Sequence, residues 1–254
     1  MIFIFGDIPL KALEEVSPYL LPHNNIEIVI HLCYYKNEED MKNITKIEYQ
    51  KKNKERFNIY IDDEYGFSVD ISIMINYSLK KGMELDDALI GDILSSEEKI
   101  SVYNYGISVL SKYAKSEFEL RLKMQRKGFE PRLIDNAISR LKEQKYLDDE
   151  RYCEMFINDK INISNHGVRK IKEALYYKGI DKEIIEEKIK IITSDSEEER
   201  AYLLGGKKLS SIKEKDTRKR MAKLSNYLIG KGFEYETVNK TLRKLINTEL
   251  EDFY

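Results

Sequence analysis

The chain has 254 residues, of which 35% are charged and 11% aromatic, and its 43 basic and 45 acidic side chains leave a formal net charge of −2. This composition excludes a disordered chain, and the small net charge by itself gives no reason to expect binding to nucleic acid. The two cysteines, Cys33 and Cys153, fit no metal-ligand or redox spacing, so we expect isolated thiols in a reducing cytosol.

The first forty residues differ in charge from the rest. They carry two basic and seven acidic side chains, so residues 41–254 alone have a net charge of +3. Their apolar run, Met1–Phe5, is too short for a membrane span and lacks a basic leader, so we expect neither membrane insertion nor export. We hypothesise that the native start is Met41 and that residues 1–40 are an extension. Alternatively they form a small cap, because residues 26–35 have the pattern of a strand.

Residues 41–96 are expected to form a β-containing module with short helices. Apolar side chains alternate with polar ones at Ile47 and Tyr49, then at Phe57, Ile59 and Ile61, then at Phe67, Val69 and Ile71. A period of two predicts strands, and the acidic stretch 62–66, which ends in glycine, predicts the turn of a hairpin. We therefore predict a small antiparallel sheet of three strands.

The period becomes helical from about Ser72. Ser95 with Glu98 three residues later matches a capping box, so we predict that the next helix begins there. This long helix would place Ile100, Tyr103, Ile107 and Leu110 on one face.

An internal repeat is marked by three Lys-Gly-apolar triplets, whose glycines lie about fifty residues apart: Lys127-Gly128-Phe129, Lys178-Gly179-Ile180 and Lys231-Gly232-Phe233. Apolar residues recur eight and four positions before each glycine, and again six, ten and thirteen positions after it. Glycine adopts the left-handed conformation that ends a helix without a Cβ penalty. An acid two residues after each glycine suits the start of another helix, at Glu130, Asp181 and Glu234.

Each triplet therefore joins the last two helices of a three-helix unit. We predict a mostly α fold with three tandem three-helix repeats, at residues 97–145, 146–193 and 195–248, preceded by the small sheet. Stacked repeats share a continuous core and would form an elongated curved array, a geometry suited to holding partners.

Catalytic chemistry has no clear pattern in this sequence. His23, His31 and His166 have no Cys, Asp or Glu nearby in a metal-ligand spacing, and adjacent acids such as Asp62 and Asp63 fit turns and helix caps better than a metal pocket. The run Gly205-Gly206-Lys207-Lys208 lacks the other residues of a phosphate loop, and we interpret it as a helix break. We expect no catalytic residue, no metal site and no cofactor.

Basic residues concentrate on the second helix of each repeat, and these are the candidate residues for binding a partner or DNA. If they line one face, they form a stripe that would follow phosphates or an acidic protein surface. The alternative is an ordinary solvated face balanced by nearby glutamates. The candidates are Lys123, Arg126 and Lys127 in the first repeat, Arg169, Lys170, Lys172 and Lys178 in the second, and Arg218, Lys219, Arg220 and Lys223 in the third.

Several motifs occur in an order and spacing that point to a known family. They are Ser116–Leu120, Lys127-Gly128-Phe129, the run Tyr146–Tyr152 with its Tyr-Leu-Asp-Asp start, and His166–Arg169 followed by Lys178-Gly179-Ile180. With these motifs the chain resembles the RecX family of bacterial recombination regulators, in its Gram-positive form, over residues 41–248. Three positions depart from the family's pattern: Lys145 and Cys153 stand where glycine and alanine are usual, and Val168 where proline often follows a glycine.

The resemblance implies a protein that binds the RecA recombinase, lies along the groove of its filament on single-stranded DNA, and usually restrains its ATP hydrolysis and strand exchange. We expect a cytoplasmic protein with no membrane contact and no small-molecule substrate. It transfers no catalytic residue to this chain.

Two other functions fit the same residues. A helix-turn-helix DNA-binding regulator without a recombinase partner would use the same three-helix units and prefer one duplex sequence over others. A metal-dependent nuclease would have to gather acids from distant positions and would cleave DNA only with a divalent ion.

Overall fold

The computed structural model describes the backbone of residues 41–51 and 53–251 and the side chains up to residue 247. The described residues form two units that divide between Ser95 and Ser96. The expectations for residues 1–40, including a strand at 26–35, lie outside the described residues.

The first unit is built on a four-stranded antiparallel sheet in the order β3-β2-β1-β4. The three predicted strands are confirmed as β1 (Lys42–Tyr49), β2 (Arg56–Ile61) and β3 (Glu64–Asp70). The prediction of only three strands was wrong, because β4 (Glu84–Leu85) pairs with the start of β1. A strand of two residues is too short to show an alternating pattern.

The hairpin between β2 and β3 turns through Asp62 and Asp63. Both residues have left-handed backbones, with φ of 50° and 69°. This is the conformation of a two-residue type I′ turn, whose twist matches that of the strands, and aspartate tolerates it better than most residues. The two adjacent acids therefore form a turn, as the sequence predicts.

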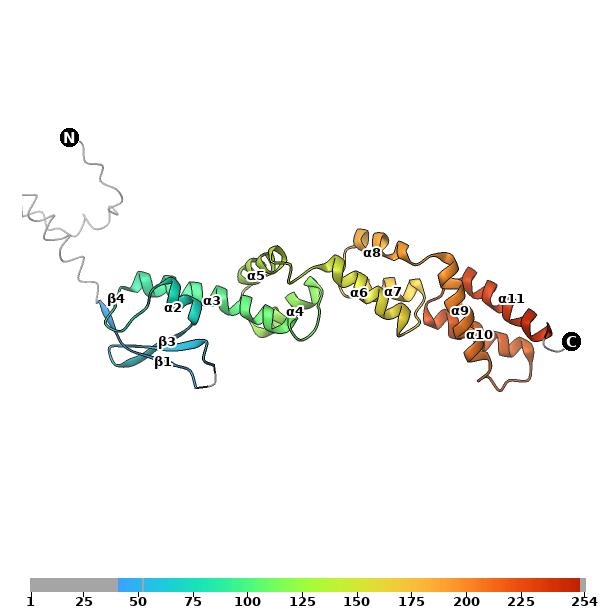
Figure 1. Cartoon of the computed structure of the whole chain (residues 1–254), viewed down its shortest axis with the longest axis horizontal. Helices are drawn as coiled ribbons and strands as arrows, with labels where there is room; N and C mark the ends of the chain where they lie inside the picture. Colours follow the sequence, from blue (N-terminus) through green and yellow to red (C-terminus); the bar gives the residue numbers. More distant parts are fainter. Residues whose placement is uncertain (1–40, 52, 252–254) are drawn as a thin grey trace, which may run out of the picture. The chain divides into compact units, whose positions relative to one another are not determined.

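Helix α2 (Ile71–Asn76) begins directly after β3. Asp70 caps it, because Asp70 Oδ1 accepts a hydrogen bond from the Ser72 amide at 2.9 Å. Ile71, expected in the third strand, is therefore the first helical residue. The helix packs against β2 and β3 (Figure 1), and Ile73 on its inner face is buried.

Helix α3 (Asp87–Leu110) runs from the first unit into the second without a break. The prediction that a new helix begins at Ser95 was wrong. A capping box requires an extended backbone at its first residue, whereas Ser95 lies inside continuous helix, and no proline interrupts the chain there. The last part of α3 is the first helix of repeat 1.

Three helical repeats make up the second unit and follow one another from green through yellow to red in Figure 1. Repeat 1 continues from α3 with α4 (Glu117–Lys127) and α5 (Pro131–Glu143). Repeat 2 consists of α6 (Asp149–Asn162), α7 (Val168–Tyr177) and α8 (Lys182–Lys188), which ends in the 3₁₀ turn η2 (Ile189–Ile191). Repeat 3 consists of α9 (Ser194–Leu209), α10 (Thr217–Lys231) and α11 (Tyr235–Glu251). The predicted mostly helical fold with three tandem repeats is thereby confirmed.

Each repeat has its own apolar core, made largely by the positions that recur around the triplet glycine. Except for Ile192 and Leu242, which are half-buried, all of those positions are buried. They are Leu120, Met124, Ile134, Ile138 and Leu141 in repeat 1, Ile171, Leu175, Ile185 and Ile189 in repeat 2, and Leu224, Leu228, Val238 and Leu245 in repeat 3.

The triplet glycines have the predicted left-handed conformation, with φ of 93° at Gly128, 72° at Gly179 and 90° at Gly232. Gly128 and Gly232 directly follow α4 and α10, and Gly179 follows Lys178, the C-cap of α7. In each repeat the third helix begins three residues after the glycine. Pro131 occupies the first turn of α5, where its missing amide hydrogen costs nothing.

The prediction of a helix break at Gly205 and Gly206 was wrong, since both lie inside α9. Gly205 is buried where α9 packs on α11. A Cβ atom at Gly205 would lie 3.1 Å from Leu245 Cδ1 and 3.3 Å from Thr241 Cγ2. The glycine therefore permits two helices to approach closely, a requirement that the local sequence does not reveal.

Lys145 gives a first testable prediction. It follows α5 with φ of 59°, a left-handed conformation that is strained for lysine and explains why glycine suits this position. We expect Lys145→Gly to stabilise the chain by about 0.5–1 kcal/mol, because relief of that strain exceeds the extra entropy of glycine in the unfolded state. Urea unfolding measures the change. The control Lys123→Gly, in the middle of α4, should lose about 1 kcal/mol, and a loss in both variants would contradict the prediction.

Candidate partner-binding surface

Repeats 1 and 2 meet where the N-terminus of α4 lies against the C-terminus of α7. Ser116, the N-cap of α4, donates its hydroxyl hydrogen to the Lys178 carbonyl at 2.6 Å, and Lys178 Nζ donates to Glu119 at 2.7 Å. The two helices approach so closely that a Cβ atom on Gly179 would lie 2.4 Å from Phe118 Cβ. The second triplet is therefore a docking point as well as a helix end.

Repeats 2 and 3 meet in the same way. The N-terminus of α7 lies on the C-terminus of α10, with the Gly167 amide donating to the Lys231 carbonyl at 3.0 Å. Arg169 Nη2 donates to the Ile229 carbonyl at 2.7 Å, and Lys170 Nζ donates to the Gly230 carbonyl at 3.2 Å. A Cβ atom on Gly232 would lie 2.3 Å from Lys170 Cβ.

Each of these contacts, which we call repeat junctions, also uses an acid from the first helix of the later repeat. Asp149 accepts a hydrogen bond from the Glu117 amide, and Glu197 accepts one from the Val168 amide, both at 2.8 Å. Burial raises the pKa of both carboxyl groups. The amides involved are the first of α4 and α7, where a carboxylate satisfies a donor that the helix leaves free.

Opposite charges hold the first junction together. Burial alone would raise the pKa of Glu119, but its hydrogen bond and ion pair with Lys178 outweigh burial, and the pKa lies below its usual value. The Lys178 ammonium also lies 5.5 Å from the ring centres of Tyr152 and Phe156. Glu119 additionally accepts a hydrogen bond from the Tyr152 hydroxyl at 3.2 Å.

The basic residues predicted from the sequence separate into groups with different surroundings. Arg169, Lys170 and Lys178 hold repeat junctions. Lys172 and Lys223 form ion pairs inside their own repeats, with Glu186 at 2.7 Å and Glu214 at 3.0 Å, and Arg220 is half-buried. Five are exposed and have no ion pair with any residue that the structure describes: Lys123, Arg126 and Lys127 on α4, and Arg218 and Lys219 on α10.

These positions change how Arg169, Lys170 and Lys172 should be tested. From the sequence, reversing their charges is predicted to weaken partner binding more than folding. Carboxylates at Arg169 and Lys170 would instead face the backbone carbonyls of Ile229 and Gly230 and would weaken the junction itself. The junction role was missed because sequence patterns locate these residues on a helix without revealing what lies opposite.

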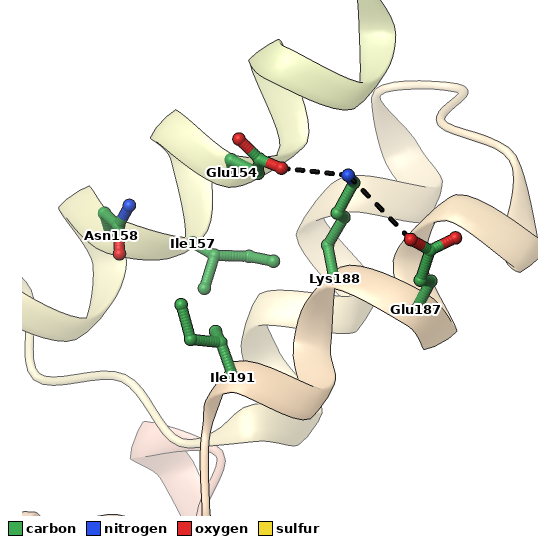
Figure 2. Close-up of a pocket in the computed structure, with 6 residues that line it drawn as sticks. All are labelled: Glu154, Ile157, Asn158, Glu187, Lys188 and Ile191. Atoms are coloured by element: carbon green, nitrogen blue, oxygen red, sulfur yellow. Dashed lines mark ion pairs between the residues drawn. The ribbon is translucent and has the colours of Figure 1, made fainter.

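A hollow of about 250 Å³ lies in repeat 2 between α6 and α8 (Figure 2). Its apolar wall includes Ile157 and Ile191, and Lys188 stands at its rim. The Lys188 ammonium is held by Glu154 at 2.9 Å and by Glu150 at 3.0 Å, and these hydrogen bonds raise its pKa. Lys188 therefore joins the first and third helices of the repeat, and its charge is already neutralised.

A second hollow, of about 200 Å³, lies between repeats 1 and 2. Its lining includes three cations, Lys115, Lys145 and Arg151, one acid, Asp148, and the exposed Tyr146. Cations beside an exposed aromatic ring are typical of surfaces that hold single-stranded nucleic acid.

The remaining reactive side chains are isolated. Among the described residues no three His, Cys, Asp or Glu side chains gather closely enough to hold a metal ion. Cys153 is buried, and burial raises its pKa to about 11, so the thiol is unreactive. Burial, followed by Lys170, Lys231 and Lys160, lowers the pKa of His166. His23, His31 and Cys33 lie outside the described residues.

No helix in the described part of the chain is long and apolar enough to cross a membrane.

Four family models match the chain in sequence. The model of the regulatory protein RecX N-terminal domain matches residues 42–86, and the models of the first, second and third three-helix domains of RecX match residues 103–141, 148–189 and 195–242. These matches confirm the resemblance inferred from the motifs.

Related proteins cover most of the chain. The regulatory protein RecX of Clostridium perfringens is 36% identical over 211 residues, which are 82% of this chain and 99% of that protein. The regulatory protein RecX of Clostridium beijerinckii is 35% identical over 84% of this chain and 100% of its own length.

Two solved structures have a similar fold. A crystal structure of regulatory protein RecX superposes with a TM-score of 0.66 and 28% identity, over 80% of this chain and 99% of the other. The structure of RecX from Lactobacillus salivarius, at 24% identity and a TM-score of 0.56 over 59% of this chain and 97% of the other, supports the fold alone.

The three triplet glycines give a second prediction. Alanine at any of them puts a Cβ atom on a left-handed backbone, at a cost of about 1 kcal/mol. At Gly179 and Gly232 the Cβ atom also collides with the preceding repeat, whereas at Gly128 it meets no atom within 4 Å. We expect Gly179→Ala and Gly232→Ala to lose about 1–3 kcal/mol more than Gly128→Ala in urea unfolding. Equal losses at all three positions would contradict the docking role.

Glu119 gives a third prediction, concerning pH. Its pKa is lower in the folded chain than in the unfolded one, so its charge stabilises the fold above the unfolded pKa, and this contribution is lost as the pH falls through the folded pKa. We expect the stability difference between the unmodified chain and Glu119→Gln to be large near neutral pH and to shrink below about pH 4.

Urea unfolding of both proteins over this pH range measures the difference. The control Glu143→Gln changes an exposed carboxylate at the end of α5 and should show a small difference at every pH. A Glu119→Gln effect that stays constant with pH would argue against the ion pair.

Proposed function

The chain belongs to the RecX family of regulatory proteins, and we propose that it binds the filament that the RecA recombinase forms on single-stranded DNA and lowers its rates of ATP hydrolysis and strand exchange. The observation that carries the proposal is the pair of matching repeat junctions. They stack three similar units in a fixed order. Similar units that recur along one chain suit a partner whose own surface recurs, such as successive subunits of a filament.

The proposed mechanism requires no reaction on this chain. A regulator changes the rate of its partner when it binds one state of that partner more tightly than another. Acting in the cytoplasm, the chain would favour a filament state that hydrolyses ATP slowly. It would do so without a cofactor or small-molecule substrate.

The basic hollow between repeats 1 and 2 supports an approach to the DNA inside the filament. Lys145 and Arg151 supply positive charge, and the Tyr146 side chain is 59% exposed, enough for a base to stack on its ring. Contacts of this kind depend on phosphate and base stacking and have little sequence preference. This suits a protein that follows a filament over any DNA sequence.

The fourth prediction tests this function directly. ATP hydrolysis by the cognate RecA on single-stranded DNA should fall as the purified full chain is added at sub-stoichiometric amounts. One bound chain contacts several recombinase subunits in this proposal, so less than one chain per subunit suffices.

A control with the chain and DNA but no recombinase accounts for any hydrolysis by the preparation itself. An unchanged rate with a folded chain would contradict the proposal. Selection of binding sites from random duplex DNA would then test the helix-turn-helix alternative.

A further inference from the structure

The second helices of the three repeats meet end to end. The N-terminus of α4 lies on the C-terminus of α7, and the N-terminus of α7 lies on the C-terminus of α10. The C-terminus of α4 is a third end of the same kind. A Cβ atom on Gly128 would meet nothing within 4 Å, so no residue that the structure describes covers this end as Phe118 covers Gly179.

The free end of α4 already has the geometry of the occupied ends. The Gly128 amide donates to the Gln125 carbonyl at 2.9 Å and the Phe129 amide to the Met124 carbonyl at 3.3 Å. At the end of α10 the corresponding hydrogen bonds, from Gly232 and Phe233, have the same lengths, 2.9 Å and 3.3 Å. The Lys127 carbonyl therefore holds the position that the Lys178 and Lys231 carbonyls hold where they accept hydrogen bonds.

The charges around this end favour an acidic occupant. Lys123, Arg126 and Lys127 are exposed, and Arg126 and Lys127 lie three and four residues after Lys123, so both neighbour Lys123 on the surface of α4. Lys127 corresponds to Lys178, which pairs with Glu119 in the first turn of the helix docked on it. The backbone carbonyls at the end of α4 carry partial negative charge, which attracts the amide groups at the start of another helix.

We propose that the C-terminal end of α4 docks the N-terminus of a helix in a partner protein, with a Ser, Thr or Asn cap and a carboxylate in its first turn. This is the chemistry with which Ser116 and Glu119 dock on repeat 2. The cap side chain donates a hydrogen bond to the Lys127 carbonyl, and the carboxylate pairs with the Lys127 ammonium. The inference rests on the proposed function for the identity of the partner, a recombinase subunit in the filament.

A second copy of this chain fits the site poorly. The helix it would offer is α10, the second helix of repeat 3 and the last of the three second helices that meet end to end. Asp216 caps α10, but Arg218 and Lys219 occupy its first turn and are exposed. Their charges would face Lys123, Arg126 and Lys127, so repulsion opposes self-association at this end.

The fifth prediction compares two charge-reversed chains. The triple variant Lys123→Glu, Arg126→Glu, Lys127→Glu should bind the RecA filament roughly tenfold or more weakly than the unmodified full chain, in co-sedimentation at fixed salt. The control Lys80→Glu, Lys81→Glu, Lys99→Glu reverses three exposed cations on other segments and should bind within about twofold. Circular dichroism and urea unfolding establish that both variants are folded.

A photo-crosslinking residue at Arg126 separates a protein partner from DNA. Irradiation with the assembled filament should join the chain to recombinase, at the first turn of a helix that contains Asp or Glu, as identified by mass spectrometry. Adducts only with DNA, or only with a second copy of the chain, would overturn the proposal.

The outcomes also separate this inference from the proposed function. If the unmodified chain binds and inhibits the filament but both triple variants bind equally well, the α4 site is wrong and the function stands. If the unmodified chain does not bind the filament, the proposed function and the recombinase as the partner at α4 both fail.

Discussion

The helical unit depends on the left-handed turn that ends the second helix of each repeat. At Gly179 and Gly232 the missing side chain has two effects, because it removes the strain of a positive φ and lets the preceding repeat approach within contact distance. Each repeat buries its own apolar core, so the cores alone do not order the repeats. Their order is set where the start of one second helix satisfies the carbonyls at the end of the next.

Sequence periodicity predicted most of the fold, since the burial that creates a period acts on neighbouring turns of one element. The recurring positions around the triplets, such as Leu120, Ile171 and Leu224, are buried as expected. The errors arose where segments distant in the sequence determine the local structure. Two residues of β4 become a strand only by pairing with β1, and Gly205 serves a contact with α11 rather than a break in α9.

The candidate surface could be predicted only in part. The sequence placed the basic residues on the second helices, where the structure has all of them except Lys178, the C-cap of α7. A count of charges, however, does not identify their partners. Arg169 donates to a carbonyl 60 residues later in the chain, a contact that no local pattern reveals. The lysine before each triplet glycine was the one sequence signal that could have pointed to these contacts, because a glycine can end a helix without a lysine before it.

The end-to-end contact of α4, α7 and α10 gives the repeats a polarity. One end of this series presents helix carbonyls surrounded by cations, and the other presents the amides of α10 capped by Asp216. A symmetric protein can be reversed on a surface and make the same contacts again, whereas this series cannot. On a linear partner whose two ends differ, the chain therefore binds in one orientation only. The orientation of the bound chain then shows the direction of the partner.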